Sequence, residues 1–260
     1  MIALLALPAA FAAARPRGAD GRFEKRESSH FVLHQDVDID ESGGLRGSRR
    51  FEQQVLQELE VAYERLDAFL GLRPSRRIAV FIYDGEVFDA RLGGRFRFQI
   101  AGFFNGAIHI RGATQLTVEL GRVLHHELVH AAFHAAAPSL VLPAWLNEGV
   151  AEWFEARALS KRHLSAGELA YLSRALSSGA WLGLGTLSQP NFARLPAGGA
   201  RLAYLQSYGM VEHLVRVYGE RALRELCRDV VRGRDLERSL LRSVHRGVRE
   251  LEADFQAEFS

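Results

Sequence analysis

The pentapeptide His126-Glu127-Leu128-Val129-His130 carries the residue types of a metal site at a helical spacing. Positions i and i+4 of an α-helix lie one above the other, so His126 and His130 can direct imidazole nitrogens at one ion. Glu127 projects beside that face, where it can reach a water bound to the metal rather than the metal itself. The pattern therefore predicts two metal ligands and a general base on one helix.

A third ligand is expected from residues 145–152, which read Trp-Leu-Asn-Glu-Gly-Val-Ala-Glu. A catalytic zinc ion takes three protein ligands and keeps a fourth position open, and a carboxylate commonly joins a histidine pair of this spacing. Glu148 supplies that carboxylate. Two nitrogens and one oxygen suit zinc well, so Zn2+ is the predicted cofactor.

Two helices must place these ligands. Residues 114–135 contain no proline and only one glycine, Gly121, and they carry apolar residues at helical spacing, which predicts a helix with one buried face. Pro143 is favoured in a first helical turn and opens a second predicted helix that continues through Phe154. A short turn at 136–139 lets the second helix fold back against the first.

The pentapeptide and the Asn-Glu-Gly segment together resemble the gluzincin metallopeptidases, which are the thermolysin and aminopeptidase-N type, and especially the peptidase MA-like domains. The resemblance implies that Glu148 is the third zinc ligand. It also implies that the acidic residue one turn later, Glu152, orients the first histidine, and a ligating imidazole does need its other N–H held. Glu155 is expected to be a solvated surface residue.

Other zinc-site families differ from this pattern. The metzincin motif requires Gly and His where this chain has Phe133 and Ala136. The region around His126 contains charges and no run of about 18 apolar residues, which excludes an intramembrane site. Aminopeptidases of the resembling family hold the substrate's amino terminus with a Gly-x-Met-Glu-Asn segment, which does not occur here, so an endopeptidase is favoured.

The same resemblance implies a tyrosine that stabilises the oxyanion. Residues 202–214 are similar to a downstream helix of the aminopeptidase-type gluzincins, and the tyrosine near the start of that helix corresponds to Tyr204. A phenol can donate a hydrogen bond to the charged oxygen of a tetrahedral intermediate. Tyr208, one turn later, and His213 remain alternatives.

The predicted function is hydrolysis of peptide bonds through a zinc-activated water, with Glu127 as the general base. Two alternatives remain open: a non-catalytic relative that binds zinc or peptide, and a zinc hydrolase with a non-peptide substrate. The intact Glu127 argues against the first, because a purely structural zinc site needs no base.

Composition limits the class of protein further. The chain has 260 residues, 48% of them hydrophobic, and a composition of this kind is typical of a globular protein. Its formal charge is +2, and it contains no long run of like charges of the kind that indicates nucleic-acid binding. A peptide or protein substrate is the expected partner, and no oligomeric state is indicated. The one cysteine, Cys227, lies in an apolar helical pattern and is expected in the core.

The first 14 residues form an apolar, alanine-rich run that is similar to the hydrophobic region of a signal peptide, although no basic residue precedes it. The run is too short to span a bilayer as a stable helix. Export to the periplasm or the extracellular space is therefore the expectation.

The expected fold class is α+β, with one catalytic domain over residues 30–260. A linker at 15–29 precedes a small mixed-sheet lobe with one long helix at 30–113. The active-site helices and a mainly α-helical C-terminal lobe follow at 114–260, with the zinc cleft between the lobes.

Periodicity predicts strands at 30–34 and 77–83, a helix from Phe51 to Gly71, and a hairpin of 99–104 with 107–110. In the gluzincins, an extended peptide adds to a sheet edge beside the zinc. Either 102–104 or 107–110 could form that edge, and a hairpin buried within the sheet is equally compatible.

Overall fold

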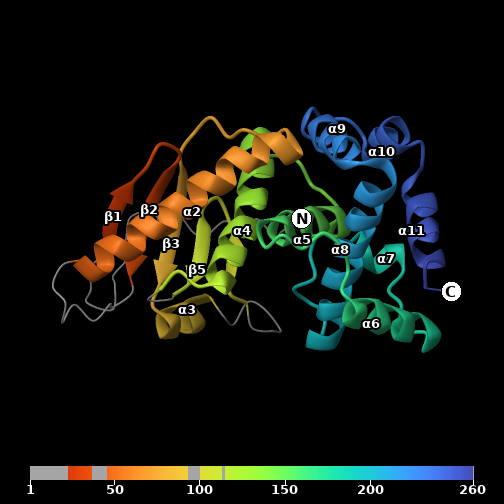
Figure 1. Ribbon diagram of the computed structural model, residues 1–260, viewed down its shortest axis with the longest axis horizontal. Coiled ribbons are helices and arrows are strands. Elements are labelled where there is room, and N and C mark those ends of the chain that lie inside the picture. The colour runs from red at the N-terminus through yellow and green to blue at the C-terminus, as the bar shows by residue number, and fades with distance from the viewer. Residues whose placement is uncertain (1–22, 37–45, 93–99, 113–114, 260) are drawn as a thin grey trace.

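The computed structural model describes residues 23–36, 46–92, 100–112 and 115–259. They form a mixed β-sheet with covering helices at one end and a helical half at the other, so the predicted α+β class is confirmed (Figure 1). The predicted leader at 1–14 lies outside the described residues. Within the described part of the chain, no helix has the length and apolar character needed to cross a membrane.

The strands are β1 (Glu24–Glu27), β2 (Phe31–Asp36), β3 (Ile78–Tyr83), β4 (Gly102–Phe104) and β5 (Ile108–Arg111). The helices are α2 (Arg46–Leu70), α3 (Gly85–Leu92), α4 (Val118–Ala136), α5 (Ala144–Ala158), α6 (Ala166–Ser177), α7 (Leu184–Leu187), α8 (Ala197–Tyr218), α9 (Glu220–Val231), α10 (Leu236–Val244) and α11 (Val248–Ala257).

The sheet has the strand order β1-β2-β3-β5-β4. Strands β2, β3 and β5 run parallel, whereas β1 pairs antiparallel with β2 and β4 pairs antiparallel with β5. Strand side chains point alternately to the two faces, and Phe31, Leu33, Val80 and Ile82 on one face are fully buried. Helices α2 and α4 pack on the sheet and join these residues in one continuous core.

Helix α2 is the predicted long helix. Phe51, Val55, Leu59 and Leu66 recur at intervals of four and seven residues and are almost completely buried. The helix ends before Gly71, as predicted, because that residue has a φ of +67°, which glycine adopts without steric cost. Away from this helix, the buried Cys227 confirms the expected core position.

Two short elements were not predicted. Residues 24–27 form strand β1, although the sequence indicated a linker over 15–29. All four of its side chains are charged, so no apolar alternation marks it; it forms by pairing with β2, and charged residues are common on edge strands. Helix α3 begins after Asp84, whose Oδ1 accepts a hydrogen bond from the backbone N of Glu86 at 2.9 Å.

Strands β4 and β5 form the predicted hairpin, and the structure decides which of them lies at the edge. In the described sheet β5 lies between β3 and β4, so residues 102–104 are the edge strand. Gly102 lets this strand approach α4 closely, because a Cβ there would lie 2.7 Å from Val123 Cγ1. The edge strand therefore lies against the helix that carries the histidine pair.

Helices α4, α5 and α8 position the predicted site. Helix α4 begins four residues later than predicted, because the side chain of Thr117 caps it by accepting a hydrogen bond from Leu120 N at 3.1 Å. Helix α5 begins directly after Pro143, as predicted, and packs against both α4 and α8 (Figure 1). Gly149 permits the α5–α8 approach, since a Cβ there would lie 2.4 Å from Ser207 O.

Candidate metal centre

The structure brings the three predicted ligands together. His126 and His130 lie one turn apart on α4, and Glu148 lies in the first turns of α5. Glu148 Oε2 is 3.2 Å from His126 Nε2 and 3.5 Å from His130 Nε2. Ligand atoms of the three residues all lie within 4.8 Å of one another, which is the spacing of groups that can share one ion.

The charges in this cluster depend strongly on one another. Burial alone would raise the pKa of Glu148, but the imidazoles of His130 and His126 hold it well below its usual value. Burial would lower the pKa of His126, but hydrogen bonds that its ring donates to the carboxylates of Glu148 and Glu155 raise it well above its ordinary value of 6.5. Metal binding must therefore release a proton from this cluster, so metal affinity falls as the pH falls.

Each histidine is also held on its other ring nitrogen. His130 Nδ1 lies 3.2 Å from Asn147 Oδ1, so the amide oxygen can accept the N–H of that ring. Asn147 had not been singled out in the sequence, although its place beside Glu148 was a usable signal. Both Nε2 atoms consequently face Glu148, the orientation that a shared metal ion requires.

The partner of His126 Nδ1 differs from the expectation. Glu155 Oε2 is the nearer carboxylate oxygen at 3.3 Å, while Glu152 Oε1 lies at 3.9 Å. The prediction that Glu155 is a solvated surface residue is wrong: it is 6% exposed and also accepts a hydrogen bond from Arg122 Nε at 2.7 Å. Two helical turns separate Glu155 from Glu148, and that spacing was the signal that places both on one face of α5.

Glu152 is more open than Glu155, with 27% of its side chain exposed. Burial, followed by the negative charge of Glu155, raises the pKa of Glu152 to about 7. Glu152 lies near His126, as the resemblance implied, but its carboxylate is farther from His126 Nδ1 than that of Glu155.

Glu127 lies beside the ligand cluster, as its place after His126 predicted. It is 6% exposed, and its Oε2 atom has no hydrogen-bond partner within the described residues. Burial raises its pKa above the ordinary value, more than the neighbouring imidazoles of His130 and His126 lower it. A carboxylate with a raised pKa and an unengaged oxygen is suited to accept and return a proton.

Of the two candidate tyrosines, Tyr204 faces the cluster. Its pKa is raised well above its usual value, first by burial and then by the negative charges of Glu148, Glu127 and Glu152. The ring of Tyr208 instead packs beneath the ammonium group of Lys161, whose Nζ is 4.5 Å from the ring centroid. Tyr204 is thus the phenol nearer the predicted chemistry, while both rings line a neighbouring cavity.

The third alternative, His213, is engaged elsewhere on α8. Its Nδ1 atom lies 2.5 Å from Glu258 Oε1, beyond the end of α11. The two other histidines of α4 pack against the protein, as expected: His125 Nδ1 donates to Gly121 O at 2.8 Å, and the ring of His134 lies 5.4 Å from that of Phe104.

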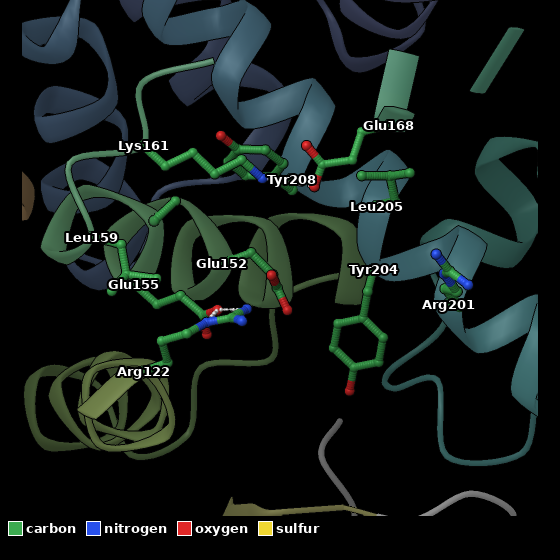
Figure 2. Close-up of a pocket in the computed structure, with 11 residues that line it drawn as sticks. Arg122, Glu152, Glu155, Leu159, Lys161, Glu168, Arg201, Tyr204, Leu205 and Tyr208 are labelled. Carbon is green, nitrogen blue, oxygen red and sulfur yellow. Dashed lines mark hydrogen bonds and ion pairs between the residues drawn. The ribbon is translucent and has the colours of Figure 1, made fainter. Parts of the chain in front are cut away.

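A cavity of about 300 Å³ opens beside the candidate metal centre, between α4, α5, α6 and α8 (Figure 2). We call it the side pocket. Glu152 and Glu155 line it from α5, and Tyr204 and Tyr208 line it from α8, so it shares walls with the surroundings of His126. The arrangement therefore combines a possible metal centre with an adjoining space for part of a ligand.

A family model described as the peptidase MA superfamily matches residues 60–259. That span includes the pentapeptide, the Asn-Glu-Gly segment and the tyrosine-bearing helix. The chain belongs to the peptidase MA superfamily, and the resemblance drawn from the motifs is confirmed. A comparison with curated protein sequences found no significant match.

Proposed function

We propose that this protein is a zinc-dependent metallopeptidase of the gluzincin type, with His126, His130 and Glu148 as the zinc ligands. The observation that carries the proposal is the convergence of two imidazole nitrogens and one carboxylate oxygen within 4.8 Å, beside a buried glutamate. Membership of a peptidase superfamily supports the same function.

The residues present fit a zinc ion. Two nitrogen donors and one oxygen donor are the ligand set of a catalytic rather than a structural zinc site. Asn147 and Glu155 hold the Nδ1 atoms, which leaves both Nε2 atoms for the metal. When bound there, zinc would act as a Lewis acid that polarises a peptide carbonyl and lowers the pKa of a coordinated water.

In the proposed reaction, Glu127 accepts the proton of the water that attacks the peptide carbonyl, and it then returns that proton to the leaving amine. Its burial and raised pKa favour the first step, because the carboxylate gains a proton more readily than an exposed glutamate would. Tyr204 is proposed to donate a hydrogen bond from its hydroxyl group to the oxyanion. Its raised pKa keeps the phenol protonated at neutral pH, as a donor must be.

An extended peptide is the proposed substrate, bound by pairing with edge strand β4. An edge strand presents unpaired backbone groups that an extended peptide can satisfy, and β4 lies against α4. We propose an endopeptidase rather than an aminopeptidase, because the sequence lacks the Gly-x-Met-Glu-Asn device for a substrate's amino terminus. The apolar run at 1–14 supports a further proposal, that the protein is exported; cell fractionation would test it.

Digestion of an unstructured protein by the zinc-loaded chain, with and without a chelator, tests the proposal. Cleavage should require the metal, and Glu127→Gln should lower its rate by about 10²- to 10⁴-fold, the usual contribution of general acid–base catalysis. The variant should retain zinc, because Glu127 is not one of the proposed ligands.

Glu225→Gln is a matched control, since it makes the same chemical change on α9, where Glu225 pairs with Arg221 at the surface. Cleavage that persists in Glu127→Gln would contradict the assigned base. Bound zinc without cleavage of any peptide would instead favour a non-catalytic binding protein or a hydrolase of another substrate.

A further inference from the structure

The side pocket carries charges that the ion pairs among the described residues do not fully match. Three cationic side chains (Arg122, Lys161 and Arg201) and three carboxylates (Glu152, Glu155 and Glu168) line it. Two ion pairs account for four of these groups. Arg122 Nε is 2.7 Å from Glu155 Oε1, and Lys161 Nζ is 2.7 Å from Glu168 Oε1.

Glu152 and Arg201 are left, and they do not pair with each other. The guanidinium of Arg201 packs over the ring of Tyr171 on α6, 5.2 Å from its centroid. Figure 2 shows Arg201 on the far side of Tyr204 from Glu152, with the Glu152 carboxylate directed into the space between α5 and Tyr204. The pocket therefore has a carboxylate in its wall that Arg201 does not neutralise.

The neighbouring histidine lies closer to Glu155 than to Glu152. Among the described ion pairs, the contact of Glu152 is His126 Nδ1 at 3.9 Å, and that nitrogen has a nearer partner in Glu155 at 3.3 Å. A cation that enters the pocket would therefore find in Glu152 a carboxylate whose described ion-pair partner already has a closer one.

The remaining walls suit an alkylammonium group. Tyr204, Tyr208, Leu159 and Leu205 supply aromatic and apolar surface, along which a methylene chain can pack. The chain's own Lys161 already places its ammonium over the ring of Tyr208, at 4.5 Å from the centroid. This contact shows that the aromatic wall accepts a primary ammonium.

We propose that the side pocket binds a primary ammonium group of the peptide substrate, with a lysine side chain beside the scissile bond as its main occupant and Glu152 as its specificity-determining partner. This inference rests on the proposed function, in which a peptide lies at the metal centre. A cavity of about 300 Å³ has room for a lysine side chain. The free amino terminus of a peptide has the same chemistry, so the experiment separates the two sources.

Binding is measured with the zinc-loaded full-length chain carrying Glu127→Gln, so that bound peptides are not consumed. The ligands are acetylated alanine-based peptides, labelled at a C-terminal cysteine and carrying lysine, norleucine or glutamate at one scanned position. Norleucine keeps the methylene chain and lacks the charge. Fluorescence anisotropy should show the lysine peptide binding about tenfold or more tightly than the norleucine peptide, the effect of a charged hydrogen bond in a shielded site.

Adding Glu152→Gln should remove this lysine preference, whereas Glu225→Gln, the matched control, should keep it. Zinc content is measured for each variant, and affinities are compared at equal metal loading, because Glu152 lies near His126. Peptides with a free amino terminus and no lysine form the second arm. A Glu152-dependent preference in that arm alone would assign the pocket to the amino terminus and would still support an ammonium site.

Equal affinity for lysine and norleucine peptides in both arms would overturn the inference, and so would a lysine preference that survives Glu152→Gln. The fate of the proposed function is read separately, from cleavage by the wild-type chain. Selective binding without any cleavage would refute the peptidase proposal and leave the ammonium site standing. Cleavage of peptides without a preference in either arm would refute the ammonium site and leave the peptidase proposal standing.

Discussion

Replacing Glu155 with alanine tests which carboxylate orients the first histidine. Glu155 Oε2 lies 3.3 Å from His126 Nδ1 and is held in place by Arg122, whereas Glu152 Oε1 lies 3.9 Å away and is more exposed. Loss of an outer partner of a metal-binding histidine typically lowers metal affinity by about 10- to 100-fold, or about 1.4–2.7 kcal/mol. We expect Glu155→Ala to lose this amount and Glu152→Ala to lose less.

The assay is competition for zinc with a chromogenic chelator at one fixed pH, since the affinity depends on protonation of the same histidine. Circular dichroism of each variant checks that it has folded. Glu155→Gln should recover part of the loss, because its amide oxygen can still accept the hydrogen bond from His126 Nδ1. A larger loss in Glu152→Ala than in Glu155→Ala would refute this reasoning and restore the orienting role implied by the family resemblance.

Three further predictions concern stability and reactivity. Gly149→Ala should lower the free energy of unfolding by about 1–3 kcal/mol or more, as measured by urea denaturation, because its Cβ would lie 2.4 Å from Ser207 O. Gly185→Ala is the control and should be tolerated, since a Cβ there would meet nothing within 4 Å. Burial raises the pKa of the Cys227 thiol to about 12, so a thiol reagent should modify it only after unfolding, and rapid labelling of the native protein would contradict this. Burial lowers the pKa of His34 below its ordinary 6.5, so as the pH falls through 6.5 the unfolded chain gains a proton that the folded chain resists, and the free energy of unfolding declines. The urea midpoints at pH 7.5 and 5.5 should therefore differ less in His34→Phe than in the wild type. An unchanged difference would exclude the effect.

Much of the fold could be predicted because its main elements have strong local patterns. Helix α2 repeats an apolar residue every three or four positions over 51–70, and the buried strands are rich in β-branched and aromatic residues. Strand β1 and helix α3 lack such patterns. β1 consists of four charged residues and depends on pairing with β2, which is not encoded within its own segment.

The candidate site, like the fold, could be predicted from the sequence only in part. The ligand types and their spacing on α4 and α5 could be read directly, because positions four apart on a helix share a face regardless of what surrounds it. The contact of Glu155 with His126 could not be predicted in this way. Whether a carboxylate two turns after Glu148 meets solvent or His126 depends on how closely α5 lies against α4.

The sequence by itself predicted the donor set and the general base and identified the superfamily, since these predictions follow from residue identity and helical periodicity. Only the tertiary structure decided that Tyr204 rather than Tyr208 faces the ligand cluster, that β4 rather than β5 is the edge strand, and that Glu152 opens into the side pocket. The physical reason is that each of these depends on packing between elements far apart in the chain. One such contact is the close approach of α5 and α8 at Gly149, which no local pattern specifies.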